Sequence, residues 1–110
     1  MKYSIILPVY NESENIQQLY ERISKVMSKF KSSYETIFVN DGSTDRTVEK
    51  LEALHKKDSA VKIINFSRNF GHQTAVSAGL KYCSGEMVAI LDADLQDPPE
   101  ILPEFFQKLE

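Results

Sequence analysis

The sequence predicts an open α/β sheet of parallel strands with helices on both faces. Short runs rich in Ile, Val and aromatic residues alternate with longer segments whose apolar residues recur at helical spacing. A single helical segment separates each pair of successive strands, which favours parallel pairing through right-handed crossovers. The chain has 110 residues and shows no internal repeat, linker or low-complexity tract, so one small domain is expected.

The first strand and the first helix are predicted over residues 3–10 and 11–31. The strand, "YSIILPVY", is short and apolar. Asn11 followed by Glu14 is typical of a capping box and predicts that the helix begins there. An apolar stripe then runs along the helix, formed by Ile16, Leu19, Tyr20, Ile23, Val26, Met27 and Phe30.

The middle of the chain predicts two more strands, over residues 34–40 and 61–66, with a helix between them. The turn "DGS" leads into that helix, and Ser43 or Thr44 is the expected cap. After the third strand, the segment "SRNFGHQ" is predicted to be a loop.

The last part of the chain predicts a helix over residues 74–83, a strand over 86–91 and a helix over 98–110. The first of these helices is apolar on most sides and is expected to be well buried. The last has proline in its first turn, where a missing N–H costs little. Its apolar residues are Ile101, Leu102, Phe105, Phe106 and Leu109. A four-strand sheet truncated after this helix is expected to be part of a larger domain.

Composition excludes several classes of function. A net charge of −3 leaves no broad basic face for nucleic acid. Cys83 is the only cysteine, so no internal disulfide can form, and a reducing compartment is expected. No stretch approaches the ~20 apolar residues of a membrane span, and the N-terminus lacks a secretory signal. A soluble, cytoplasmic chain is therefore expected.

Polar residues gather where three of the predicted strands end. The first strand ends in "PVYNE", the second in "NDGSTD" and the fourth in "DADLQD". Each segment alone has a structural explanation as a helix cap or a turn. Because the carboxyl ends of parallel strands share one edge, where open sheets bind ligands, the coincidence predicts a ligand site.

The segment after the fourth strand predicts a metal site. In an extended chain Asp92, Asp94 and Gln96 share one face. Three oxygen ligands of this kind suit Mg²⁺ or Mn²⁺, which also takes ligands from a substrate phosphate. Asp97 is interpreted as the N-cap of the last helix.

Three residues outside this cluster are weighed separately. Asp41 is interpreted as a carboxylate that accepts a hydrogen bond from a nucleobase N–H, with a turn or N-cap aspartate as the alternative. Arg68 is a candidate phosphate contact. His72 is weighed as a metal or phosphate contact, but a solvated loop histidine is the preferred interpretation.

Four motifs, "LPVYNE", "VNDGSTDRT", "RNFGHQTAVSAG" and "LDADLQDPPE", occur in order along the chain. Together they resemble the N-terminal part of a family 2 glycosyltransferase with the Rossmann-like GT-A fold. The pair "RNFGHQ" and "DLQDPPE" resembles a subgroup that makes polyprenyl-phosphate sugars. This subgroup comprises dolichol-phosphate mannose synthases and bacterial undecaprenyl-phosphate (bactoprenol) glucosyltransferases.

The resemblance implies that residues 1–110 are the nucleotide-sugar-binding part of a GT-A domain. The nucleotide-binding residues it implies are Pro8, Tyr10, Glu12, Asp41, Arg68 and Asp92, with Asp41 on the base. The metal ligands it implies, in a DxD motif, are Asp94 and Gln96, with Asp92 as a further ligand. The metal would be Mg²⁺ or Mn²⁺. Catalytic residues are expected beyond residue 110.

The implied reaction is the inverting, metal-dependent transfer of a sugar from a nucleotide-diphosphate sugar to a polyprenyl phosphate. A UDP-sugar is favoured as the donor over a GDP-sugar. The full-length protein is expected at the cytoplasmic face of the membrane, in cell-envelope synthesis. The chain alone is expected to bind nucleotide without transferring sugar, and to self-associate through the open edge near its fourth strand.

Three alternatives stay open. The first is a family 2 transferase with a polysaccharide or glycan acceptor, against which "DLQDPPE" argues. The second is a phospho-accepting receiver domain, which needs a lysine at the end of a late strand that this sequence lacks. The third is a non-catalytic nucleotide-binding or interaction fragment.

Overall fold

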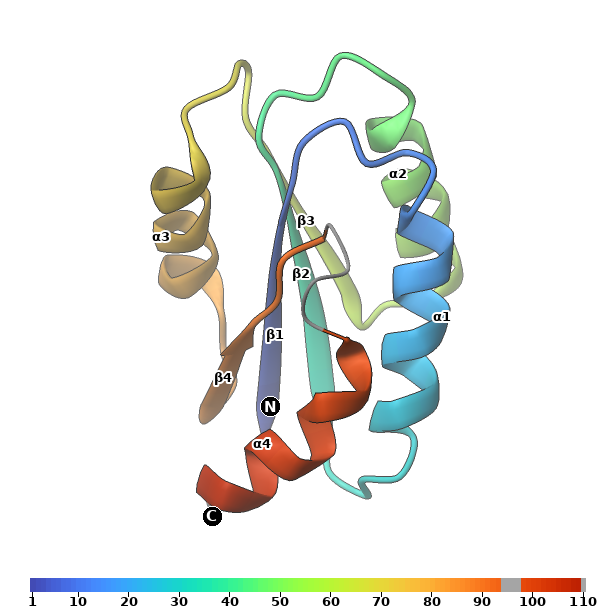
Figure 1. Cartoon of the computed structure of the whole chain (residues 1–110), viewed down its shortest axis with the longest axis vertical. Helices are drawn as coiled ribbons and strands as arrows, with labels where there is room; N and C mark the ends of the chain where they lie inside the picture. The colour runs from blue at the N-terminus through green and yellow to red at the C-terminus, as the bar shows by residue number, and fades with distance from the viewer. Residues whose placement is uncertain (94–97, 110) are drawn as a thin grey trace.

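The computed structural model describes residues 1–93 and 98–109, and its centre is a four-stranded parallel sheet (Figure 1). The strand order is β3-β2-β1-β4. β1 (Tyr3–Val9) lies between β2 (Tyr34–Asn40) and β4 (Met87–Ile90), and β3 (Val61–Asn65) pairs with the far side of β2. The predicted open parallel sheet is confirmed.

Helices cover both faces of this sheet, as predicted (Figure 1). α1 (Ile16–Met27), α2 (Thr47–Lys57) and α4 (Leu102–Leu109) pack on one face. α3 (His72–Tyr82) packs alone on the other. A short 3₁₀ turn, η1 (Pro99–Ile101), leads into α4. No helix among the described residues is long and apolar enough to cross a membrane.

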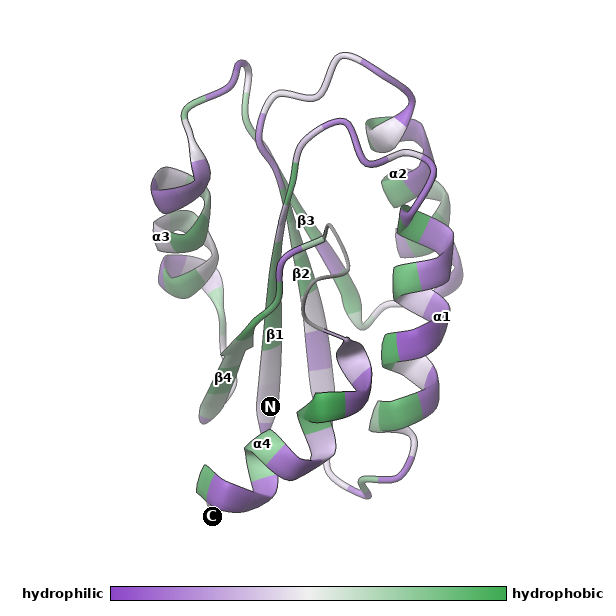
Figure 2. Ribbon diagram, in the orientation of Figure 1, coloured by the Kyte–Doolittle hydropathy of each residue, from purple (hydrophilic) through white to green (hydrophobic). Residues whose placement is uncertain are grey.

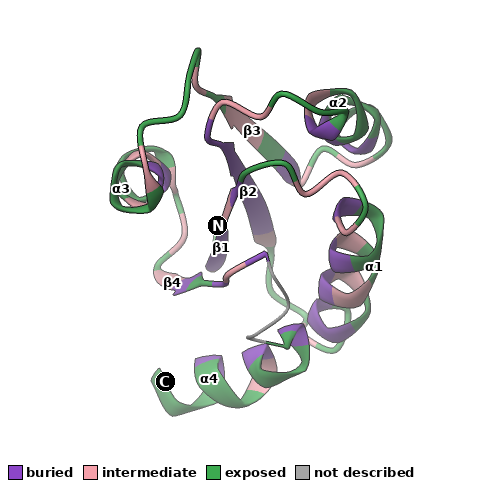
Figure 3. Ribbon diagram, turned by 45° about the horizontal axis from the view of Figure 1, so that its top comes forward, coloured by how far each residue is buried: buried purple, intermediate pink, exposed green. Residues whose placement is uncertain are grey.

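Alternation along β1 divides the core into two layers, because successive side chains of a strand point to opposite faces. Tyr3, Ile5, Leu7 and Val9 pack against α1, α2 and α4, whereas Ile6 faces α3. The apolar side of α1 faces the sheet (Figure 2), and the central strands are the most deeply buried part of the chain (Figure 3).

The predicted capping box at the start of the first helix is wrong. α1 begins only at Ile16. Asn11 adopts a left-handed φ of 53°, which asparagine tolerates better than most residues. Its side-chain oxygen accepts the backbone N–H groups of Thr44, at 2.7 Å, and Asp45, at 3.3 Å. Asn11 therefore joins the loop after β1 to the loop after β2.

The predicted cap of the second helix is also wrong. α2 begins at Thr47, whose backbone N–H donates to Asp45 at 3.0 Å, while Ser43 accepts from the N–H of Asn11. Partial desolvation raises the pKa of Asp45, but hydrogen bonds from Thr47 and Ser13 outweigh it and lower the pKa to about 2. Asp45 thus takes the role that was predicted for Ser43 or Thr44.

α3 is not well buried, contrary to the prediction. Only Ala75 and Gly79 are buried in it, whereas Leu80 and Tyr82 are exposed. A Cβ on Gly79 would lie 2.5 Å from the Cγ2 of Ile6, so the helix approaches the sheet through its small residues. The larger apolar side chains of α3 therefore remain on its outer side.

α4 has one buried and one exposed apolar side. Phe106 is fully buried, and its ring centroid lies 4.4 Å from that of Tyr3. Phe105 is 40% exposed, and Ile101 and Leu109 are exposed beside it. Of the two phenylalanines on the predicted apolar side of this helix, only Phe106 is covered by the sheet.

At the amino edge of the sheet, Glu35 is a buried carboxylate that joins three segments. It accepts the Ser4 hydroxyl at 2.7 Å, and the Ser84 backbone N–H and hydroxyl at 2.7 and 3.0 Å. The Ser4 oxygen in turn accepts the N–H of Gly85 at 2.8 Å. Burial raises the pKa of Glu35, but these hydrogen bonds outweigh it and leave the pKa below its ordinary value.

Candidate functional site

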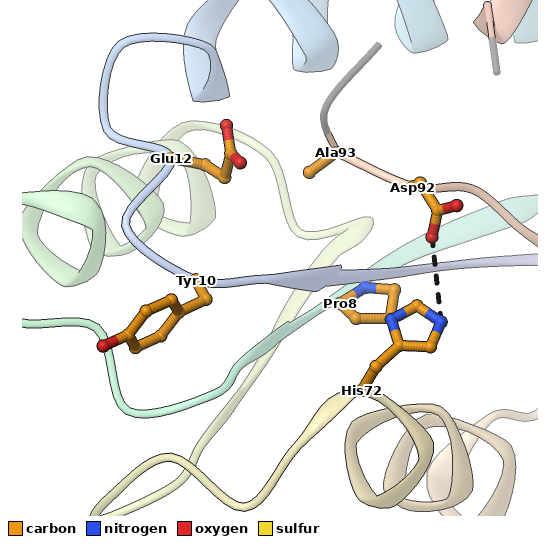
Figure 4. Close-up of a pocket in the computed structure, with 6 residues that line it drawn as sticks. All are labelled: Pro8, Tyr10, Glu12, His72, Asp92 and Ala93. Carbon is orange, nitrogen blue, oxygen red and sulfur yellow. Dashed lines mark ion pairs between the residues drawn. The ribbon is translucent and has the colours of Figure 1, made fainter. Parts of the chain in front are cut away.

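A cavity of about 390 Å³ opens at the carboxyl edge of the sheet, where sequence reasoning expected a ligand (Figure 4). The end of β1, the first residue of α3 and the segment after β4 meet there. The parallel sheet brings these segments together because all its strands end at this edge. The residues that line the cavity are Pro8, Tyr10, Glu12, His72, Asp92 and Ala93.

A second cavity, of about 300 Å³, adjoins the first and shares Pro8, Tyr10 and His72 with it. Its other lining residues are Val9, Asp41, Asn69 and Gly71. Of the predicted nucleotide-binding residues, Asp41 lines this cavity and Asp92 lines the first. The structure thus gives the two carboxylates different surroundings, and the separation of Asp41 from the predicted metal cluster stays a prediction.

Asp41 is 5% exposed and accepts hydrogen bonds from the loop that precedes α3. Its Oδ1 accepts the backbone N–H of Phe70 at 2.7 Å and that of Gly71 at 3.3 Å. Its Oδ2 accepts the same Gly71 N–H at 3.1 Å. The carboxylate therefore holds the loop that carries Asn69 and leads into His72, the first residue of α3.

Gly42 allows this loop to approach closely. Its φ is +74°, and a Cβ there would lie 2.2 Å from the carbonyl carbon of Arg68. Any other residue would both strain the backbone and push the loop away. The motif "NDG" thus brings the loop onto the end of β2.

His72 lies at the N-terminus of α3 and faces the segment after β4. Its Nε2 is 3.7 Å from Oδ1 of Asp92, and the two side chains point toward one another (Figure 4). The ring is exposed, but it lines both cavities, so the solvated-loop interpretation understated its position. Asn69 lines the second cavity but is absent from the predicted site. Asn69 and His72 both follow β3 at the carboxyl edge of the sheet, and this position is the signal in the sequence that could have identified them.

Arg68 occupies a different place from the one its predicted role suggests. Its guanidinium carbon lies 4.4 Å from the ring centroid of Phe70, whose ring packs edge-on against Phe66. Among the described residues that line the two cavities, Arg68 does not appear. Its contact with a phosphate stays a prediction.

The predicted metal site lies only partly within the described residues. Asp94, Gln96 and the predicted cap Asp97 lie outside them. In residues 1–93 and 98–109, no group of three or more His, Cys, Asp or Glu side chains is placed to hold a metal ion. Asp92 is nevertheless a suitable metal ligand, because a half-exposed carboxylate at an open polar cavity is an oxygen donor of the type that Mg²⁺ and Mn²⁺ prefer.

Known proteins resemble this chain over nearly its whole length. An uncharacterized glycosyltransferase of Bacillus subtilis is 51% identical over 98% of the chain and 33% of its own length. A bactoprenol glucosyl transferase of a Shigella phage is 40% identical over 98% of the chain and 35% of its own length. A dolichol-phosphate mannosyltransferase of Pyrococcus furiosus is 40% identical over 100% of the chain and 30% of its own length. The chain thus spans about a third of the length of these relatives.

Solved structures share the fold. Residues 1–349 of S. aureus TarS, in complex with UDP-GlcNAc, superpose with a TM-score of 0.70 at 30% identity, covering 86% of this chain and 27% of that TarS chain. Glucosyl-3-phosphoglycerate synthase of Mycobacterium tuberculosis, solved with Mn²⁺, UDP and glucosyl-3-phosphoglycerate, superposes with a TM-score of 0.76 at 24% identity. That match covers 98% of this chain and 39% of the synthase.

The family model described as glycosyl transferase family 2 matches residues 4–110. This span contains the described sheet except Tyr3, the first residue of β1, and all residues that line the two cavities at its carboxyl edge. With its parallel GT-A sheet and its four motifs, the chain belongs to glycosyl transferase family 2.

Proposed function

We propose that residues 1–110 are the donor-binding part of an enzyme that transfers a sugar, with inversion, from a nucleotide-diphosphate sugar to a polyprenyl phosphate. The observation that carries this proposal is the pair of adjoining cavities at the carboxyl edge. One has a buried carboxylate, Asp41, for a base, and the other has a half-exposed carboxylate, Asp92, on the diphosphate side. The names of the bactoprenol and dolichol-phosphate relatives support the lipid-phosphate acceptor.

In this proposal the nucleotide lies across the end of β1. Its base occupies the cavity beside Asp41, and its ribose and diphosphate extend past Pro8 and Tyr10 toward Asp92. Glu12 closes the first cavity on the side of the loop after β1. His72 lines both cavities and is therefore placed between base and diphosphate. Arg68 would have to leave its contact with Phe70 to reach a phosphate.

Asp92, with Asp94 and Gln96, would hold a divalent metal, Mg²⁺ or Mn²⁺. When bound, the metal supplies positive charge that stabilises the leaving diphosphate as a Lewis acid. The carboxylate of Asp92 would help to hold the ion after β4, and the backbone that Asp41 holds shapes the other side of the pocket. The acceptor phosphate is already anionic, so no strong base is required of these residues.

The acceptor site is proposed to lie outside these 110 residues, in a full-length protein at the cytoplasmic face of the membrane. Holding acceptor and donor together supplies roughly 7–11 kcal/mol of barrier reduction, which donor binding alone cannot replace. The chain alone is therefore proposed to bind nucleotide without transferring sugar. In the described sheet β4 is an edge strand, and this edge with the exposed Ile90 and Phe105 would allow the isolated chain to self-associate.

Calorimetric titration of UDP and GDP, with Mn²⁺ or with EDTA, tests donor and metal binding together. The proposal predicts binding that weakens in EDTA, and an Asp94→Asn variant that loses most of the metal-dependent part. Glu104→Gln, on the exposed side of α4, is the matched control and should bind like the parent. Equal affinity of the parent chain in Mn²⁺ and EDTA would contradict the metal role.

The acceptor half of the proposal needs a transfer assay. Radiolabelled UDP-glucose or GDP-mannose is incubated with Mn²⁺, a polyprenyl phosphate and the chain, and the lipid is then extracted. Label in the organic phase is expected to equal the Asp94→Asn background. Label above that background would show that these residues contain an acceptor site and can act alone.

A further inference from the structure

We infer that four polar side chains outside the two cavities are positioning residues for nucleotide binding and act through Tyr10 and Glu12. These four side chains, the interloop cluster, join the loop after β1 to the residues that follow β2, and they are Asn11, Ser43, Asp45 and Thr47. None of them is among the described residues that line either cavity. This inference rests on the proposed function, because it concerns how the protein holds the walls of the proposed nucleotide site.

Three successive backbone N–H groups after β1 donate to three side chains after β2. The N–H of Asn11 donates to the hydroxyl of Ser43 at 2.9 Å. The N–H of Glu12 donates to the hydroxyl of Thr47 at 3.1 Å. The N–H of the next residue donates to Oδ2 of Asp45 at 3.3 Å. These side chains therefore hold the backbone of the loop after β1 on both sides of Glu12, which lines the first cavity.

Asn11 accepts hydrogen bonds in the opposite direction and has an unusual backbone conformation. Its φ of 53° makes it the one residue other than glycine with a positive φ among the described residues. This conformation costs free energy when a side chain is present, so surrounding contacts must stabilise it. Oδ1 of Asn11 accepts the backbone N–H groups of Thr44 at 2.7 Å and Asp45 at 3.3 Å. Because Asn11 lies between Tyr10 and Glu12 in the chain, its conformation determines how both of them reach the first cavity (Figure 4).

The position of Tyr10 depends on this backbone, because its side chain is only partly covered by the rest of the protein. Tyr10 is 45% exposed, yet it lines both cavities. A loop that is already held loses less conformational entropy on binding than a loop that the nucleotide itself must order. Loss of the interloop cluster is therefore expected to weaken nucleotide binding, although the cluster lies outside the cavities.

The first test compares two replacements of Thr47, whose side chain is fully buried. Thr47→Val keeps the shape of the side chain but lacks the hydroxyl that accepts the N–H of Glu12, whereas Thr47→Ser keeps that hydroxyl. Calorimetric titration of UDP in Mn²⁺ measures the affinity of each variant. Thr47→Val is expected to lower the affinity about three- to tenfold, the range of one ordinary hydrogen bond, and Thr47→Ser by less than about twofold.

Glu35→Ala is the matched control, because it removes hydrogen bonds at the amino edge of the sheet. It should lower stability and leave the affinity for UDP unchanged. A fall in affinity with Thr47→Val but not with Glu35→Ala therefore excludes general destabilisation as the cause. Unchanged affinity in Thr47→Val, or an equal fall in Thr47→Ser, would overturn the inference and leave the proposed function intact. A parent chain that binds neither UDP nor GDP would overturn both.

The second test asks whether Asn11 acts through Tyr10, and it uses an exposed position whose replacement leaves the core intact. Asn11→Gly accommodates the positive φ but lacks the oxygen that accepts the N–H groups of Thr44 and Asp45. It is expected to lower the affinity for UDP about three- to tenfold in the parent chain. In a Tyr10→Ala background the fall should be about twofold, since the side chain that Asn11 positions is then absent. Equal fold-changes in the two backgrounds would show that Asn11 does not act through Tyr10 and would overturn the inference.

Discussion

Two buried carboxylates stand at opposite ends of β2, and their surroundings give them different roles. Glu35, at the amino end, is 3% exposed, and its hydrogen bonds come from β1 and from the segment before β4. Asp41, at the carboxyl end, is 5% exposed and holds a loop, but it also lines a cavity. The same chemical group therefore stabilises the framework at one edge and is available to a ligand at the other.

The largest expected effect is on stability, from Glu35→Ala. The change leaves the Ser4 hydroxyl and both donors of Ser84 without their acceptor. Hydrogen bonds to charged groups contribute about 1.5–3 kcal/mol, so a loss of roughly 3 kcal/mol in the free energy of unfolding is expected. Urea unfolding followed by circular dichroism measures it, and nucleotide affinity of the folded fraction should not change.

The matched control for Glu35→Ala is Glu104→Ala, whose carboxylate is exposed and, among the described residues, pairs with Lys108 one turn away. Such a surface pair contributes about 0.5 kcal/mol or less. If both variants lose equal stability, the hydrogen bonds of Glu35 do not support the sheet as described.

Asp41→Ala is expected to affect both properties at once, which is what distinguishes the two edges. The Phe70 and Gly71 N–H groups lose their acceptor, and the second cavity loses its buried carboxylate. Nucleotide affinity should fall by roughly 1.5–3 kcal/mol, with or without metal, and the melting temperature should fall too. Calorimetry and thermal unfolding measure the two effects. Unchanged affinity with a lower melting temperature would favour the turn-aspartate alternative.

His72→Ala is expected to have a smaller effect, confined to binding. The ring is exposed and lines both cavities, so its loss should weaken UDP by about twofold to tenfold, the range of one ordinary hydrogen bond. Stability should stay within ~0.5 kcal/mol, as for surface positions generally. Gln73→Ala, at the next exposed position of α3, is the control. Equal effects of both changes on UDP affinity would remove His72 from the site.

The smallest expected effect is a dependence of stability on acid. The folded-state pKa of Glu35 lies below its ordinary value of 4.5, so the folded protein binds fewer protons there than the unfolded chain. Its contribution is complete above the unfolded-state pKa and is lost as pH falls through the folded-state pKa. Glu35→Gln should flatten this part of the curve of unfolding free energy against pH.

Asp45 titrates in a neighbouring window, with a pKa of about 2, but it is exposed. Screening in 0.5 M salt should therefore reduce the contribution of Asp45 to the pH dependence of stability more than the contribution of the buried Glu35. If the parent and Glu35→Gln have parallel acid curves in high salt, Glu35 does not hold a lowered pKa.

Much of this fold could be predicted because periodicity reports which side of an element is buried. The second strand was predicted over residues 34–40, the bounds of β2. The failures concern tertiary contacts. α3 packs through Ala75 and Gly79, so its large apolar residues indicated burial that the packing does not provide. Asn11 was predicted to cap the first helix because the local sequence gives no sign of its hydrogen bonds to the loop after β2.

The candidate site likewise has a part that could be predicted from the sequence and a part that depends on tertiary contacts. Pro8, Tyr10, Glu12 and Asp92 could be placed together because parallel strands end at one edge, and the structure brings these four side chains to one cavity. Loop conformation could not be predicted from composition, so the stacking of Arg68 on Phe70 was missed.

The approach of His72 to Asp92 likewise depends on how α3 is set on the sheet, which no pattern in the sequence encodes. The same holds for the hydrogen bonds of Asp41, since their donors are backbone groups about 30 residues away along the chain.

The central claim is that nucleotide binds at the carboxyl edge of the sheet and not at the amino edge. Titration of UDP with Mg²⁺ into the ¹⁵N-labelled chain, followed by amide chemical shifts, tests it most directly. Shifts are predicted to move at Tyr10, Asp41, Gly71 and Asp92, while those of Ser4, Glu35 and Gly85 stay fixed. Saturating UDP that moves the amino-edge amides, or moves none at the carboxyl edge, would contradict it.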